Sequence, residues 1–238
     1  MRLAVLACGT AAIGLTLLAV AGPSYRVGAL SLANAFTLFR WAAYIGAAGA
    51  LLALAAAGVA YRRRDWRQML VAVPALLAGL TAFGVPLEFQ RRAQSAPPIH
   101  DITTDLENPP LFEAVVPLRT DAPNSLERPS DLGELQRAGY PDIAPITLPL
   151  PREQVFDRAL AAAQEQEWQI VTADKSSGRI EATDTTSWFG FKDDIAIRLT
   201  AWGSGTRVDV RSVSRVGRND TGTNARRIRG YLARLQSR

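Results

Sequence analysis

Three long apolar runs in the first 89 residues constrain the fold of this chain more than any other feature. Residues 3–21 and 69–87 contain no charged side chain, and residues 36–61 contain only Arg40, near their start. Each run is close to the ~20 residues that a helix needs to cross ~30 Å of hydrocarbon. Helices in a soluble core seldom run this long without a polar face. We therefore expect residues 1–89 to form a transmembrane anchor with three spans.

The first run has a second interpretation, as a signal peptide. Arg2 precedes it, and the small residues Ala19 and Ala21 stand near its end, as they would at a cleavage site. Both fates of residues 1–21, retention as a span and removal, remain open from the sequence.

The loop between the second and third runs predicts the orientation. It contains Arg62, Arg63, Arg64 and Arg67, and a cluster of this kind stays in the cytoplasm. The N-terminus is then cytoplasmic, and everything after residue 87 lies on the outer side, with or without the first run. We expect a multi-pass protein of the bacterial inner membrane with a periplasmic C-terminal domain.

The net charge of +5 says little about nucleic acid, because it resides in the apolar part. Residues 1–89 hold seven arginines and two acidic residues, whereas residues 90–238 are formally neutral. The expected partners are the lipid bilayer and an envelope protein or lipid, and no nucleic acid. One Cys and one His exclude an intramolecular disulfide and a multi-histidine metal site. We expect no cofactor and no metal.

Residues 90–142 have a different character from the runs before them. Eleven of the 14 prolines fall between residues 97 and 151, and apolar residues such as Ile99, Phe112 and Val115 punctuate the segment. A flexible linker would be polar and repetitive. We predict an extended strap that lies across a folded domain, with disorder as the alternative.

Alternating apolar residues and short turns predict an α+β domain over residues 143–238. The strands are expected at 143–148, 168–173, 179–186, 194–202 and 206–216, and the helices at 151–168 and 223–236. Consecutive short turns favour an antiparallel sheet of about four to five strands with both helices on one face.

Several separated motifs suggest a family. They are residues 99–105 (IHDITTD), 189–194 (FGFKDD) and 211–217 (RSVSRVG). The combination resembles the bacterial domain-of-unknown-function family numbered 1499, over roughly residues 95–237. The resemblance implies a membrane-anchored envelope protein, and it implies no activity and no catalytic residues.

His100 is the first candidate for chemistry. With Asp101 and Asp105 it could form an acid–base or metal group if a second set of ligands, for example Asp193 and Asp194, also converged on it. The alternative is a histidine in a hydrogen-bonded strap, with carboxylates that cap turns. No phosphate loop, nucleophile elbow or metal-ligand cluster accompanies it.

Asp194 directly follows another aspartate, Asp193, at the start of a predicted strand. Adjacent strand residues point to opposite faces, so the pair cannot serve one inward site without a bulge. Salt bridges to Arg179, Arg198 or Arg211 are the structural alternative.

Trp188, Phe189 and Phe191 crowd the predicted turn before Asp193. Such an aromatic tip could cap the core, cover a ligand pocket or dip into the membrane interface.

Asp184, Ser212 and Ser214 continue the predicted inward faces of two strands. If the strands align, one end of the buried face becomes a polar pocket floor. A solvent-exposed sheet end, or a bulge near Ser212, is the alternative.

Residues 220–224 resemble half of a calcium loop, with Asp220 and Asn224 as oxygen donors. The full spacing and the terminal Glu are missing. Capping of the last helix by Asp220 or Thr223 explains the pattern better.

These observations favour a non-catalytic binding or envelope-assembly domain, which would bind its partner through the aromatic tip, the strap and the basic last helix. The first alternative is a lipid or small-ligand binding domain with a pocket under the aromatic tip. The second is a hydrolase-like enzyme that uses His100 and a carboxylate.

Overall fold

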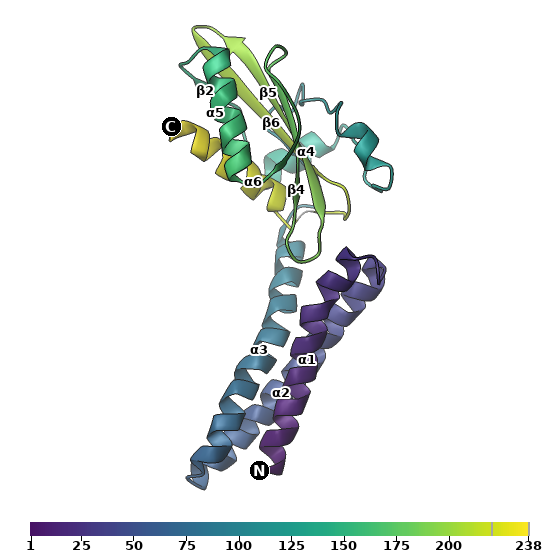
Figure 1. The fold of residues 1–238 in the computed structure, drawn as a ribbon, viewed down its shortest axis with the longest axis vertical. Helices are drawn as coiled ribbons and strands as arrows, with labels where there is room; N and C mark the ends of the chain where they lie inside the picture. The colour runs from purple at the N-terminus through teal and green to yellow at the C-terminus, as the bar shows by residue number, and fades with distance from the viewer. Residues whose placement is uncertain (220, 238) are drawn as a thin grey trace. The chain divides into compact units, whose positions relative to one another are not determined.

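The computed structural model describes residues 1–219 and 221–237. The chain divides into two compact units (Figure 1). The first, which we call the helical unit, comprises Met1–Arg92 together with Ser187–Gly190. The second, the sheet unit, comprises Ala93–Thr186 and the chain from Phe191 onward.

Three helices build the helical unit: α1 (Arg2–Arg26), α2 (Leu32–Arg62) and α3 (Trp66–Ser95). Their most apolar windows have mean hydropathies of 2.3, 1.9 and 2.0. By length and composition all three could cross a membrane, which confirms the three predicted long apolar helices and supports membrane association. Each helix extends beyond the apolar run that predicted it.

Glycines bring the three helices into close contact. A Cβ atom on Gly46 would lie 2.7 Å from Cβ of Ala82 and 2.9 Å from the carbonyl oxygen of Gly79. A Cβ atom on Gly14 would lie 2.9 Å from the amide nitrogen of Gly46. The backbones approach too closely here for any side chain, as is typical of small-residue contacts between membrane helices.

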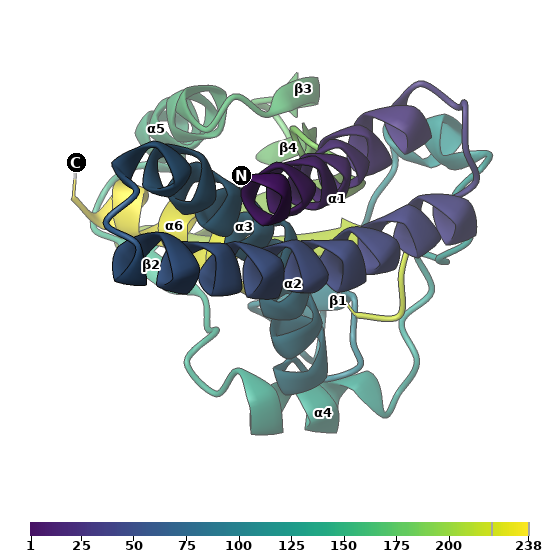
Figure 2. The ribbon, with the colours of Figure 1, turned by 90° about the horizontal axis from the view of Figure 1, so that it is seen from below.

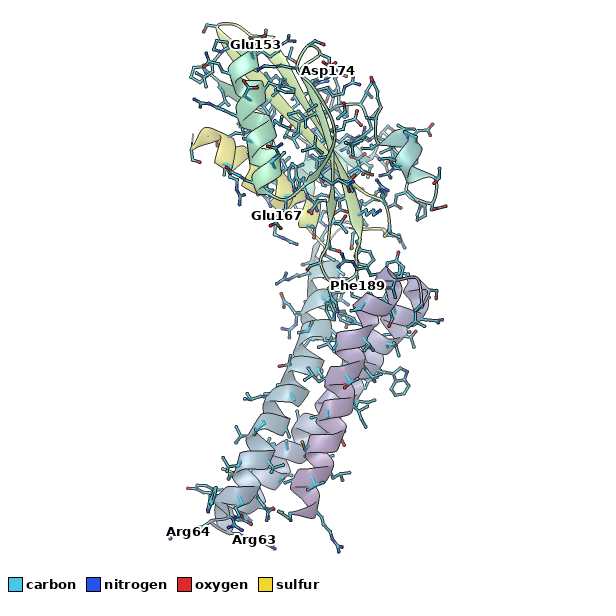
Figure 3. All side chains as sticks on the ribbon, viewed as in Figure 1. Arg63, Arg64, Glu153, Glu167, Asp174 and Phe189 are labelled. Atoms are coloured by element: carbon cyan, nitrogen blue, oxygen red, sulfur yellow. The ribbon has the colours of Figure 1, made fainter. Side chains whose placement is uncertain are left out.

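The two ends of the helical unit differ in chemistry. Arg63 and Arg64 lie at one end, and Phe189 lies at the other (Figure 3). The arginine loop and the aromatic residues of Ser187–Gly190 therefore mark opposite ends of the same bundle.

The sheet unit is built on one antiparallel sheet of six strands. The strands are β1 (Asp101–Thr103), β2 (Ile146–Leu148), β3 (Gln169–Asp174), β4 (Arg179–Thr185), β5 (Lys192–Trp202) and β6 (Gly205–Ser214). The order is β1-β6-β5-β4-β3, and β2 also pairs with β6. The sheet exceeds the expected four to five strands because the strap contributes β1.

Two helices, α5 (Arg152–Glu165) and α6 (Thr223–Gln236), pack on one face of this sheet and enclose the main apolar core. Ile195, Ile197 and Leu199 alternate along β5 and point into that core. This arrangement confirms the predicted α+β class and the shared face of the two helices.

The strap covers the opposite face. Phe112 and Val115 pack there against Ala196 and Val213 of the sheet. The strap also contains the 3-10 helix η1 (Val116–Arg119) and a short helix, α4 (Leu132–Gly139), on the side of the sheet away from α5 (Figure 2). The strap that was predicted as extended thus also contains two short helical segments. A helix of eight residues shows too few turns to produce a recognisable period among so many prolines.

The last helix has the predicted bounds, but its N-cap differs from the prediction. Gly222 is its N-cap, with a φ of +75°, and no side chain forms the cap hydrogen bond. Thr223 is therefore the first helical residue and not the cap, and Asp220 lies outside the described residues.

Candidate functional site

Asp193 and Asp194 act on opposite faces of the sheet, as their adjacent positions on β5 predict. Oδ2 of Asp193 accepts a hydrogen bond from Nη2 of Arg227 on α6 at 2.6 Å. Asp194 instead forms ion pairs with Arg119 of the strap and with Arg215, which follows β6. One dipeptide thus ties the helix layer and the strap to the same strand.

The arginine partners differ from the expected ones. Arg179 pairs with Glu113, Arg198 with Asp105 and Asp209, and Arg211 with Asp101. The prediction of these three as partners of Asp193 and Asp194 was wrong, because strand alternation gives the face of a residue and not its partner across the layer.

Arg227 occupies the position where a pocket floor was considered. The strand register places Asp184 and Ser214 on either side of Asp193. Nη2 of Arg227 also donates to Oδ2 of Asp184 at 2.7 Å, and its Nη1 donates to Oγ of Ser212 at 3.1 Å. The polar end of the buried face is thus filled by a guanidinium from α6.

Asn224 completes this polar cluster. Its Oδ1 accepts from Ser212 at 2.7 Å and from Arg227 at 2.5 Å. Its Nδ2 donates to Oγ of Ser214 at 3.0 Å and to the carbonyl oxygen of His100 at 2.9 Å. Asn224 therefore links the helix to the sheet and to the strap, rather than serving a calcium loop.

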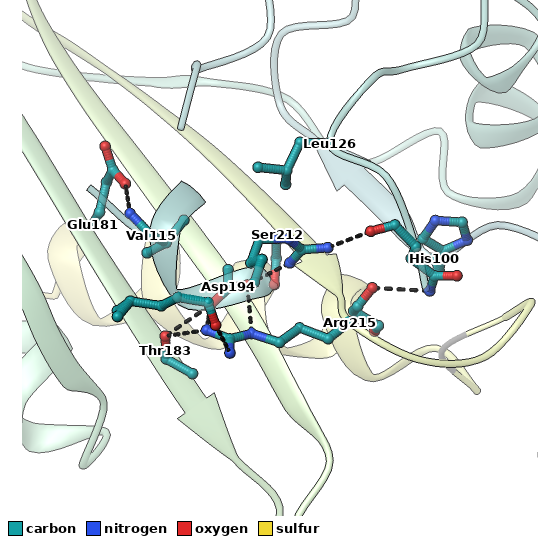
Figure 4. A network of polar contacts seen from close by, with 12 residues as sticks. His100, Val115, Leu126, Glu181, Thr183, Asp194, Ser212 and Arg215 are labelled. Carbon is teal, nitrogen blue, oxygen red and sulfur yellow. Dashed lines mark hydrogen bonds and ion pairs between the residues drawn. The ribbon is translucent and has the colours of Figure 1, made fainter. Parts of the chain in front are cut away.

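The ionisation of these groups follows from their partners. Burial lowers the pKa of Arg227, but the negative charges of Asp193 and Asp184 outweigh burial, so the pKa lies above the ordinary value for arginine. Burial raises the pKa of Asp194, whereas hydrogen bonds from Arg215, Thr183 and Arg119 hold it below the ordinary value. Figure 4 shows Asp194 between Arg215 and Thr183. Both groups stay charged at neutral pH.

The acidic residues near His100 are also held by arginines. Asp101 is buried and accepts from Nη2 of Arg211 at 2.8 Å, and Nη1 of Arg128 lies 3.0 Å from it. Asp105 accepts from Arg198 at 2.9 Å. The structure therefore does not bring Asp101, Asp105 and Asp194 together around His100. In the described part of the chain, no group of three or more His, Cys, Asp or Glu residues could hold a metal ion.

The aromatic residues of the predicted tip are divided between the two units. Trp188 and Phe189 belong to the helical unit, where the ring of Phe189 stacks on Phe36 with centroids 5.5 Å apart and meets Phe39 edge-on. Phe189 is buried there. Phe191 belongs to the sheet unit, and its amide donates to Oγ1 of Thr186 at 2.8 Å.

The same segment makes polar contacts within the helical unit. Nη1 of Arg26 donates to the carbonyl oxygen of Ser187 at 2.7 Å. The indole of Trp188 covers Gly22, where a Cβ atom would lie 2.6 Å from the ring. Trp188 and Phe189 are thus packing residues of the bundle end.

Sequence reasoning did not identify Arg227, Arg119 and Glu181, which organise the buried polar groups. Glu181 is fully buried, and its two carboxylate oxygens accept hydrogen bonds from the amides of Glu113 and Val115 at 2.9 and 3.0 Å. Figure 4 shows the contact with Val115. A signal existed for Arg227, because it lies three residues after Asn224 and four before Tyr231, on one face of its helix. A charge on such a face indicates a buried partner.

A small pocket opens where the strap meets β3 and β4. Its volume is about 210 Å³. The lining residues are Glu113, Ala114, Thr172, Asp174, Ser177, Arg179 and Glu181. None of them was a candidate site residue from the sequence, since they come from three separate segments.

Apolar spans joined to an α+β sheet unit with an internally paired charge network define a membrane protein with a folded domain. Comparison of its sequence with protein-family profiles identifies the family. The chain belongs to the family described as protein of unknown function (DUF1499), whose profile matches residues 101–235. This result confirms the resemblance found from the motifs. A search of curated proteins found no match.

Proposed function

We propose that this protein is a bacterial inner-membrane protein whose sheet unit is a non-catalytic binding or envelope-assembly domain in the periplasm. The observation that carries the proposal is the use of the charged residues. A catalytic role would require accessible carboxylates. Asp101, Asp193 and Asp194 are instead buried and paired with arginines. Such pairing stiffens a scaffold and leaves its outer surface for recognition.

The orientation rests on the arginine loop. Arg62, Arg63 and Arg64 stand together at the end of α2, which favours a cytoplasmic position for this end. Three spans then carry the chain after α3 to the other side of the membrane.

The two alternative functions have less support. A ligand pocket on Asp184, Ser212 and Ser214 competes with Arg227 for the same space. The two carboxylates that a hydrolase built on His100 would use, those of Asp101 and Asp105, are each paired with an arginine.

The orientation is tested by cysteine labelling in a Cys8→Ala background. Ser204→Cys places a thiol in the exposed β5–β6 turn, and Arg63→Cys places one in the arginine loop. In spheroplasts, a membrane-impermeant maleimide should label Ser204→Cys at once and Arg63→Cys only after permeabilisation. The reverse pattern would overturn the periplasmic assignment.

Binding is tested by native mass spectrometry of the full chain, gently extracted from its own membrane. A protein that co-purifies at fixed stoichiometry supports an assembly domain. A bare chain contradicts the proposal. A reproducible small-molecule adduct that disappears in Trp188→Ala/Phe191→Ala would favour the ligand-binding alternative instead.

A further inference from the structure

The two edge strands of the sheet, β1 and β3, differ in how their outer backbone groups are bonded. At one edge, the backbone of β1 is bonded by side chains: Nε2 of Gln136 donates to the carbonyl oxygen of Thr103 at 2.6 Å, and Oε1 accepts the Thr103 amide at 3.1 Å. Arg128 donates to the carbonyl oxygen of Asp101 at 2.8 Å. These contacts occupy the outer side of β1 and prevent another strand from pairing there.

The other edge is β3, a strand of six residues that pairs only with β4 among the described residues. Its residues are partly or fully exposed. The register with β4 shifts between Ile170 and Thr172, so a bulge interrupts the first half of the strand. Bulges limit pairing at a free edge. The regular part of the edge is therefore Thr172–Asp174, next to the pocket.

The pocket beside this edge has the size of a site for one side chain. Its volume of about 210 Å³ is below the roughly 300–1,000 Å³ of small-molecule sites. Thr172 and Asp174 of the edge strand belong to its lining, so a chain that pairs with β3 would pass its mouth.

The charge of the pocket selects a cation. Three carboxylates line it, those of Glu113, Asp174 and Glu181, against the single guanidinium of Arg179. Hydrogen bonds from Ser176 and Ser177 lower the pKa of Asp174 to about 2, so that this carboxylate is ionised at neutral pH. Arg179 pairs with Glu113, whereas Asp174 is an exposed carboxylate at the strand end with no ion pair to Arg179 among the salt bridges of the described residues.

We propose that the free edge of β3 binds an extended peptide segment of a partner protein, and that a Lys or Arg side chain of this segment enters the pocket beside Thr172 and Asp174. Main-chain hydrogen bonds to an edge strand supply affinity, and a pocket for one side chain supplies specificity. This inference rests on the proposed function and names the chemistry of the partner.

The experiment uses the full chain in nanodiscs and a fluorescein-labelled peptide of alternating threonine and valine with one central lysine. Matched peptides carry glutamate or norleucine in place of the lysine. Fluorescence anisotropy should show the lysine peptide binding about tenfold more tightly than either control. Equal binding of the three peptides, or no binding of any, would overturn the proposal.

Two variants test the location. Glu113→Gln/Asp174→Asn removes charge from the pocket and should weaken binding of the lysine peptide about tenfold. Thr172→Arg places a cation at the edge and should weaken binding of the lysine peptide by at least about tenfold. Glu153→Gln, on the exposed start of α5, is the matched control and should have no effect. Thermal unfolding of each variant verifies that the fold is retained, and unchanged binding in both pocket variants would contradict the location.

Failure of the edge-strand site can be distinguished from failure of the proposed binding function. If a partner co-purifies and stays bound to Glu113→Gln/Asp174→Asn, the edge-strand site is wrong and the binding function stands. If nothing co-purifies with the wild-type chain, the function itself fails.

Discussion

Arg227 and Asp193 form an ion pair across the interface between α6 and the sheet, with Nη2 and Oδ2 2.6 Å apart and side chains only 4% and 5% exposed. The pair is 34 residues apart in the chain. Because Arg227 also reaches Asp184, one guanidinium pairs with two carboxylates at the end of the apolar core. Its removal would leave buried negative charge.

Arg227→Met should therefore destabilise the sheet unit by about 3–5 kcal/mol, the cost of breaking a buried ion pair. Denaturant unfolding of the full chain in detergent measures this loss. Arg229→Met is the control, because Arg229 pairs with Asp142 at the surface and should cost only about 0–1 kcal/mol. Equal losses in the two variants would contradict a special role for Arg227.

The stability of the sheet unit should depend on the ionisation of Asp194. Its pKa in the folded state lies below the ordinary value of 3.8, so the contribution of Asp194 is fully present above pH 3.8 and is lost as the pH falls through the folded pKa. Asp194→Asn should be less stable at neutral pH and should lose less stability on acidification. Unfolding midpoints measured from about pH 6 down to about pH 3 test this sign. A variant with the same slope as the wild type would refute it.

The glycine contacts predict a steric effect in the membrane. Gly46→Val places methyl groups where even a Cβ atom would lie 2.7 Å from Ala82, so the helices must separate. We expect a loss of about 1–3 kcal/mol, the usual cost of overpacking. Thermal unfolding in detergent compares it with Gly58→Val, a position on the same helix with nothing within 4 Å of a Cβ atom. The control should unfold like the wild type.

Phe189 should hold the segment Ser187–Gly190 in the helical unit. Phe189→Ala removes a buried ring from its contacts with Phe36 and Phe39, at a cost of about 3–5 kcal/mol. Limited proteolysis should then cut residues 186–191 faster than in the wild type. Trp202→Ala, which removes a 57% exposed ring, is the control. Unchanged cleavage of Phe189→Ala would show that the ring does not retain the segment.

The agreement between sequence and structure has a clear limit. Length and hydropathy predicted α1, α2 and α3, and alternation predicted β5 and β6, because each pattern is contained within one segment. The secondary structure of the strap was not predicted in this way. Its strand β1 is three residues long, and α4 has eight, so neither repeats a period often enough to be recognised.

The candidate site shows the same limit at the level of side chains. The opposite faces of Asp193 and Asp194 followed from strand geometry alone. Their partners did not, because Arg227 and Arg119 come from segments 34 and 75 residues away.

The sequence by itself determined three apolar spans, an antiparallel α+β domain and the family of the chain, since these depend on local periods and motifs. Only the tertiary structure decided that Arg227 fills the polar end of the core, that Trp188 and Phe189 pack with the helices, and that β3 remains an edge beside an acidic pocket. These features arise where distant segments meet, and their pairing is set by packing and charge complementarity across layers rather than by any repeat along the chain.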